Sequence, residues 1–169
     1  MRLTLLHEIS QFLTALEQTQ DGLLELFSAK RKALSSFQAE DLMRLAGVEG
    51  ELAARLQKLV KERADLLLKA RDAGFVVESL LELAGAIGRT VGDARVLRAI
   101  ELIRGRIVQA QQRTTRLQHE GWVHWIISHR CYNHFTELLD LIANGGHPAP
   151  TYGEKAPMAA GGALLDAAA

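Results

Sequence analysis

The sequence has few of the residues that stop helices or cross-link chains. All three prolines, Pro148, Pro150 and Pro157, lie in the last 22 residues. Because proline lacks a backbone N–H, residues 1–147 are free of the strongest helix breaker and favour long helices. The single cysteine, Cys131, excludes an internal disulfide and fits a reducing compartment.

The chain also lacks net charge and long apolar runs. Its 20 Lys and Arg balance its 20 Asp and Glu, so the whole chain offers no field that attracts nucleic acid or an anionic membrane. The first six residues begin like a signal peptide, but Glu8, Gln11 and Glu17 interrupt the apolar run. No later stretch approaches the ~20 apolar residues of a membrane span. We therefore expect a cytoplasmic protein that makes no membrane contact.

Leu, Ala, Glu, Arg and Gln dominate the chain, and apolar residues recur at steps of three and four. One such segment runs from residue 5 to about 34 and a second from about 42 to 66, and we expect Gly74 to stop the second helix. A short segment around 80–85, ended by Gly85 and Gly88, leads to a third that ends near 144. We predict an all-α fold: an antiparallel helical hairpin, a short connecting helix and one long third helix. They form a three-helix, coiled-coil-like bundle over residues 1–144, and residues 145–169 form a flexible Pro/Gly/Ala-rich tail.

The third helix carries a continuous apolar stripe and is too long for the first two to cover. Its stripe includes Ile103, Ile107, Leu117, Trp122, Trp125, His129, Tyr132, Phe135 and Leu139. At 1.5 Å per residue the helix would be about 75 Å long, against about 45 Å for helices of roughly 30 residues. Part of the stripe is therefore expected to be uncovered.

No constellation of residues predicts catalysis, a metal or a cofactor. Histidines recur every five residues in the third helix, at His119, His124, His129 and His134. Five residues advance a helix by about 500°, so these side chains do not share a face. Cys131 has no nucleophile motif around it, and the glycines near 85–92 lack the Lys-Ser/Thr of a phosphate loop. We predict a protein that is not an enzyme, with no cofactor.

Aromatic residues gather near the end of the third helix. Trp122, Trp125, Tyr132 and Phe135 are four of the nine aromatic residues in the chain. Trp and Tyr dominate binding hot spots because they bury a large area with few rotatable bonds. The stripe is interpreted either as part of the bundle core or as a surface for a partner protein, and both interpretations stay open.

Arginines are in excess between Arg89 and Arg130, where eight of them meet only Asp93, Glu101 and Glu120. Such a helix could bind nucleic acid through phosphate contacts. It could equally pair with acidic residues of the first two helices or of a protein partner. Nucleic-acid binding is therefore the weaker interpretation.

The pattern of the first two helices resembles the FlgN family of flagellar type III export chaperones. The matching residues are Leu26-x-x-x-Lys30-Arg31-x-Ala33-Leu34, Asp41-Leu42-x-x-Leu45 and Glu51-Leu52-x-x-x-Leu56-x-x-Leu59-x-x-x-Arg63-x-x-Leu66-Leu67. Thr151-Tyr152-Gly153 is similar to the Tyr-Gly element that often follows the last helix in that family. The resemblance covers residues 3 to 155.

The resemblance implies a cytoplasmic chaperone that holds helical ends of hook-filament junction proteins before export. The client-binding residues would be those of the stripe listed above, and Tyr152 would contact a subunit of the export gate. The alternatives are a coiled-coil scaffold that self-associates, for example as a homodimer through the aromatic stripe, and the Arg-rich nucleic-acid binder.

Overall fold

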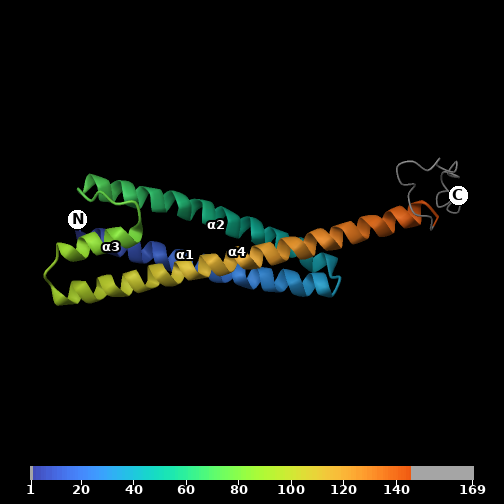
Figure 1. The fold of residues 1–169 in the computed structure, drawn as a ribbon, viewed down its shortest axis with the longest axis horizontal. Helices are drawn as coiled ribbons and strands as arrows, with labels where there is room; N and C mark the ends of the chain where they lie inside the picture. Colours follow the sequence, from blue (N-terminus) through green and yellow to red (C-terminus); the bar gives the residue numbers. More distant parts are fainter. Residues whose placement is uncertain (1, 146–169) are drawn as a thin grey trace. The chain divides into compact units, whose positions relative to one another are not determined.

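The computed structural model describes residues 2–145, and these form four helices (Figure 1). They are α1 (Arg2–Ser35), α2 (Ala39–Asp72), α3 (Leu80–Arg89) and α4 (Ala94–Ala143). The described part of the chain contains no strand, so the predicted all-α class is confirmed. Apart from Gly145, the predicted tail lies outside the described residues.

The chain divides into two units, Met1–His124 and Trp125–Ala169. Helix α4 runs through this boundary, so the first unit holds α1 to α3 with the first part of α4, and the described part of the second unit is the remainder of α4. Each unit is treated separately below.

All four helices contribute to the core of the first unit. Helices α1 and α2 form an antiparallel hairpin, and α3 and the start of α4 lie beside α1 (Figure 1). Burying one large aliphatic side chain stabilises a fold by about 1.5–3 kcal/mol, so this hydrophobic core is the main source of the unit's stability. Its members are Leu5, Leu6, Ile9, Phe12, Leu13, Leu59, Leu66, Ala70, Leu80, Leu83, Ala84, Ile87, Ile100, Ile103 and Ile107.

The end of α2 is where the sequence predicts a stop, at Gly74. This glycine adopts φ +85°, a left-handed conformation that residues with a Cβ rarely take. Beyond it, the backbone N–H of Phe75 donates to the carbonyl of Ala70 at 2.9 Å, and the Phe75 ring packs against the core. This arrangement satisfies a carbonyl that the helix end would otherwise leave open.

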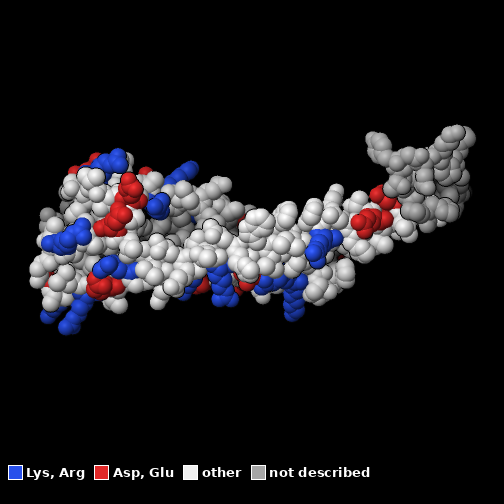
Figure 2. All heavy atoms as spheres, viewed as in Figure 1, with Lys and Arg blue, Asp and Glu red and all other residues white. Residues whose placement is uncertain are grey.

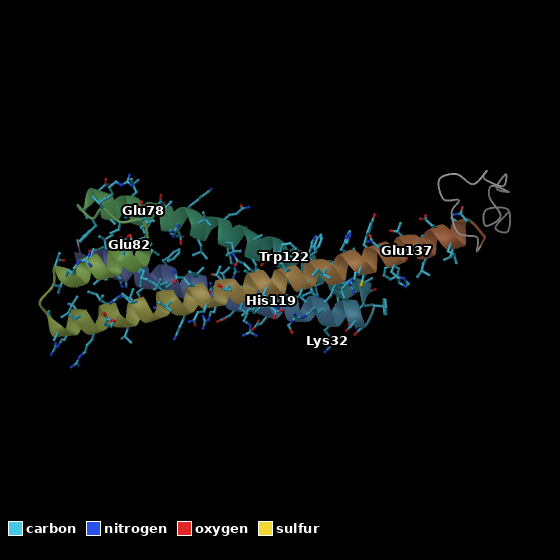
Figure 3. The ribbon with its side chains drawn as sticks, viewed as in Figure 1. Lys32, Glu78, Glu82, His119, Trp122 and Glu137 are labelled. Carbon is cyan, nitrogen blue, oxygen red and sulfur yellow. The ribbon has the colours of Figure 1, made fainter. Side chains whose placement is uncertain are left out.

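Helix α3 begins with a reciprocal cap and continues through Gly85. The backbone N–H of Glu82 donates to Ser79 Oγ at 3.2 Å, and its carboxylate accepts from the backbone N–H of Glu78 at 3.0 Å (Figure 3). The sequence predicts an end at Gly85 and Gly88, and the helix passes through Gly85 and ends at Arg89, one residue beyond Gly88. Leu83 and Ile87 are fully buried on either side of Gly85, and their burial offsets the roughly 1 kcal/mol that a glycine costs inside a helix.

Candidate protein-binding surface

The first part of α4 packs its apolar side into the core. Ile100, Ile103, Ile107 and Ala110 are its buried residues. Ile103 and Ile107 were predicted to belong to the client-binding stripe, but only 7% and 5% of their surface is exposed. They are core residues of the first unit, so the predicted stripe loses its first two members.

A two-pronged ion pair joins α4 to α1 beside this core. Arg106 Nε donates to Glu17 Oε1 and Arg106 Nη2 to Glu17 Oε2, both at 3.0 Å. The same guanidinium reaches Thr14 Oγ1 at 2.9 Å and Ser10 Oγ at 3.2 Å. The hydrogen bond from Arg106 lowers the pKa of the Glu17 carboxyl below its ordinary value. This forked geometry fixes the guanidinium more firmly than a single contact could.

Further along the same interface a polar side chain lies inside the core. Gln20 is 1% exposed, and its Nε2 donates to the carbonyl of Ala110 and to Thr114 Oγ1, both at 2.9 Å. A buried amide costs free energy unless it is hydrogen-bonded, so these bonds favour one lengthwise position of α4 on α1.

Near the end of the first unit α4 contacts the last turns of α1 through an aromatic and charged cluster. The rings of Phe27 and His124 lie 5.7 Å apart, and Arg31 forms an ion pair with Glu120. Burial lowers the pKa of His124, and the positive charges of Lys30 and Arg31 lower it further, while Glu49 raises it. The neutral imidazole is therefore the form that fits this packing.

Two residues of the predicted stripe lie in this stretch and differ in exposure. Leu117 is half-buried, whereas Trp122 is 67% exposed on α4 (Figure 3). His119, in the same stretch, is exposed too.

In the second unit none of the described residues is buried. Its large apolar side chains are exposed, with Tyr132 at 69% and Leu139 at 65%. Exposed apolar groups that adjoin one another usually mark an interaction site. The exposed large apolar residues of this unit are Trp125, Ile126, Tyr132, Phe135, Leu138, Leu139, Leu141 and Ile142.

Most of these residues lie on one side of the helix. At about 100° per residue, six of them share one half of its circumference. We call this surface the α4 apolar face, and it consists of Trp125, Tyr132, Phe135, Leu138, Leu139 and Ile142. The charged residues of the segment, Arg130, Glu137 and Asp140, fall on the opposite side. In Figure 2 this end of α4 accordingly shows mostly uncharged surface with isolated charges.

Local contacts order the beginning of the α4 apolar face. The rings of Trp125 and His129 are stacked, with centroids 5.3 Å apart and an interplanar angle of 4°. His129 in turn lies 3.4 Å from the Asn133 amide. His129 is thus at the edge of the face, where its ring stacks on the indole of Trp125.

The predicted client-binding residues therefore separate into two groups by unit. Those in the first unit are Ile103, Ile107, Leu117 and Trp122. Trp125, His129, Tyr132, Phe135 and Leu139 are all exposed in the second unit. Ile142 also lies on this face, and Leu138, which shares it, was missing from the predicted site although it lies three residues beyond Phe135. Tyr152, the predicted export-gate contact, lies outside the described residues.

The described residues contain neither a cluster of metal-binding side chains nor a helix that could span a membrane. Among residues 2–145 no group of three or more His, Cys, Asp and Glu side chains could hold a metal ion. No helix in that range is both long and apolar enough to cross a membrane.

The chain was also compared with known proteins. No family model, no curated protein and no solved structure matches it.

Proposed function

We propose that the protein binds an amphipathic helix of a partner protein along the α4 apolar face. In this proposal it is a cytoplasmic flagellar export chaperone, and the partner helix is the end of a hook-filament junction protein held before type III secretion. The observation that carries the proposal is the exposure of six large apolar side chains on one side of a helix.

The spacing of the face favours a helical partner. Trp125, Tyr132 and Leu139 are seven residues apart, and so are Phe135 and Ile142. A seven-residue repeat keeps a seam facing another helix over several turns, and each side chain inserts between residues of that helix. Trp, Tyr and Phe supply much of the area, and these rigid side chains lose little entropy on binding.

The charges of the described residues give less support to a nucleic-acid partner. Arg104, Arg106 and Arg113 form ion pairs with Glu101, Glu17 and Asp21, so part of the arginine excess is neutralised within the chain. The α4 apolar face itself carries no charge. Phosphate contacts need exposed cations, whereas a helical client needs apolar area.

The link from a helical partner to flagellar export is the sequence resemblance. Residues 26–34 and 41–67 carry the FlgN-like pattern, and in the structure they form the end of α1 and most of α2. Leu52, Leu59 and Leu66 of this pattern are buried against α1 or the core, so its leucines support the hairpin. Chaperones of that family would use the long last helix for their clients.

The test is binding of hook-filament junction proteins from the same organism to the purified chain. Replacing Trp125, Tyr132 and Phe135 together by alanine should abolish co-purification, because the exposed aromatic area is lost. The helical circular dichroism signal should stay, since none of the three side chains is buried.

A matched control is available on other elements. Met43, Val60 and Val76 are exposed apolar residues of the first unit, and their triple alanine variant should bind as the wild type does. Retained binding by the aromatic variant contradicts the assignment of the site. If instead the wild type binds DNA or RNA with a steep salt dependence, the nucleic-acid alternative replaces the proposal.

The role of Tyr152 is tested separately. Tyr152→Ala should leave client binding unchanged and weaken only docking to the export gate. Loss of client binding in this variant would contradict a division of labour between α4 and the region around Tyr152.

A further inference from the structure

We infer that, when no client is bound, the α4 apolar face pairs with the same face of a second copy of the chain in an antiparallel arrangement. The first argument is that the face is self-complementary. In one antiparallel register Trp125 lies opposite Ile142 of the second copy, and Ser128 lies opposite its Leu139. Tyr132 then lies opposite its Phe135, and the two-fold axis passes between the central aromatic pairs.

This register matches large side chains with small ones. The residues that pair in this register, which we call the seam, are Trp125, Ser128, Tyr132, Phe135, Leu139 and Ile142. Ser128 is the only small residue among them, and it lies opposite Leu139 rather than opposite another serine. A parallel, in-register pair would place Ser128 against Ser128 and Trp125 against Trp125, which leaves one layer underfilled and another overfilled. Antiparallel helices also align their dipoles favourably.

Charges do not oppose the pairing. Arg130, Glu137 and Asp140 all lie on the side of the helix away from the seam, so no ion has to be desolvated. The residues beside the seam on one edge, Cys131 and Leu138, widen the apolar contact instead. Because the seam carries no charge, its apolar area and its shape determine the affinity of the two copies for each other.

The available area reaches the range of a stable dimer. Taking the exposed fractions of the six face residues and the areas of such side chains, each copy can bury roughly 600–700 Å². The two copies together then bury roughly 1,200–1,400 Å², at the lower end of the range for specific protein interfaces. A dimer of moderate affinity is expected, which a client of equal or larger apolar surface can displace.

The dimer itself stands without the proposed function, whereas the displacement by a client rests on it. Self-association would keep the apolar face covered until a client arrives. It would also make the apparent affinity for the client depend on the concentration of the chain itself.

The experiment is light scattering coupled to size exclusion on the full chain, from micromolar to hundreds of micromolar, with a reductant present so that Cys131 cannot cross-link. We expect a concentration-dependent dimer for the wild type. Ser128→Glu and Leu139→Lys should each weaken the dimer by at least about tenfold, because each buries a charge in the seam. Val60→Lys, on an exposed part of α2, should leave it unchanged.

The register is tested by mixing the two charged variants. In the antiparallel pair the carboxylate introduced at position 128 of one copy lies opposite the ammonium introduced at position 139 of the other, and the two attract. An equimolar mixture should therefore form a heterodimer at concentrations at which each variant alone is mostly monomeric. Circular dichroism of both variants checks that the helices are intact. A monomeric wild type at all concentrations, or a dimer that Leu139→Lys leaves intact, overturns the inference.

The outcomes separate the two proposals. A monomeric wild type that still binds junction proteins removes the dimer and leaves the proposed function. A dimer that junction proteins fail to dissociate supports self-association and contradicts displacement. A mixture that stays monomeric overturns the antiparallel register.

Discussion

Two regions of α4 have a similar spacing of apolar residues and different surroundings. Around residues 100–110 and again around 125–142, large apolar residues follow one another at steps of three and four. Ile103 in the first region is 7% exposed, whereas Ile142 in the second is 55% exposed. Periodicity therefore tells which side of a helix is apolar, and only the other helices decide whether that side becomes core or surface.

The largest expected change in the free energy of unfolding is at Ile103, and the same substitution at Ile142 provides the comparison. Ile103→Ala should lower the free energy of unfolding by about 3 kcal/mol, since it removes buried methyl groups and leaves a cavity. Ile142→Ala should change it by less than about 0.5 kcal/mol. Urea denaturation of both variants measures the difference. Equal losses of unfolding free energy would mean that the second region is packed as well, which would contradict the difference between the two regions.

A smaller effect is expected from the ion pair that holds the first region of α4 to α1. Arg106→Met should cost about 1 kcal/mol, because the Glu17 pair is only partly shielded from water. The lowered pKa of Glu17 gives the wild type stability that is present above the ordinary value of 4.5 and is lost as the pH falls through the folded-state pKa. Thermal unfolding between neutral and acidic pH should therefore show a gap between wild type and variant that closes in acid. A gap that is constant with pH would contradict the role of Glu17.

The buried amide should contribute to alignment more than to stability. Gln20→Leu removes the bonds to Ala110 and Thr114 but adds apolar contact, so the free energy of unfolding should change by less than about 1 kcal/mol. Its effect should instead appear as broader or doubled NMR signals for α4 residues near 110, since the helix can then occupy more than one lengthwise position. A single sharp set of signals would show that apolar packing alone fixes the register.

The smallest expected effect is a change in the pH dependence of stability caused by His124, which lies just before the second region. Because the pKa of His124 is lowered in the folded chain, its contribution to stability is fully present above the ordinary value of 6.5 and is lost as the pH falls below it. His124→Gln should flatten the pH dependence of the melting temperature between about pH 7 and pH 5. His7→Gln, at an exposed position of α1, serves as the control. An unchanged slope in the His124 variant would assign the pH dependence to other groups.

Most of the fold follows from the positions of the helix breakers. The break after Ser35 and the stop at Gly74 were predicted within a few residues, because polar or glycine residues interrupt the apolar periodicity there. Of the two glycines predicted to end α3, only Gly88 lies near its end at Arg89; the helix continues through Gly85 because Leu83 and Ile87 are buried, a tertiary effect that local propensity does not contain. The start of α4 at Ala94 agrees with a cap from Asp93, whose Oδ1 accepts from the backbone N–H of Arg95 at 2.8 Å.

The candidate site could be predicted only in part. The stripe of apolar residues was visible in the sequence, but its division into a buried and an exposed portion was not. Ile103 and Ile107 are buried because α1 and α3 supply Ile9, Leu13 and Leu83 to the same core, residues roughly 90 or about 20 positions away along the chain. No pattern within α4 itself carries that information.

The continuity of α4 has a consequence for how a partner would be detected. Residues 125–143 have no buried side chain to stabilise them, so their helix depends on intrinsic propensity and on extension from the turns before it. Their backbone amides should therefore exchange with solvent deuterium far faster than those of residues 100–110. Any helix that docks on the apolar face would slow this exchange, so the protection of these amides becomes a direct and site-resolved readout of occupancy.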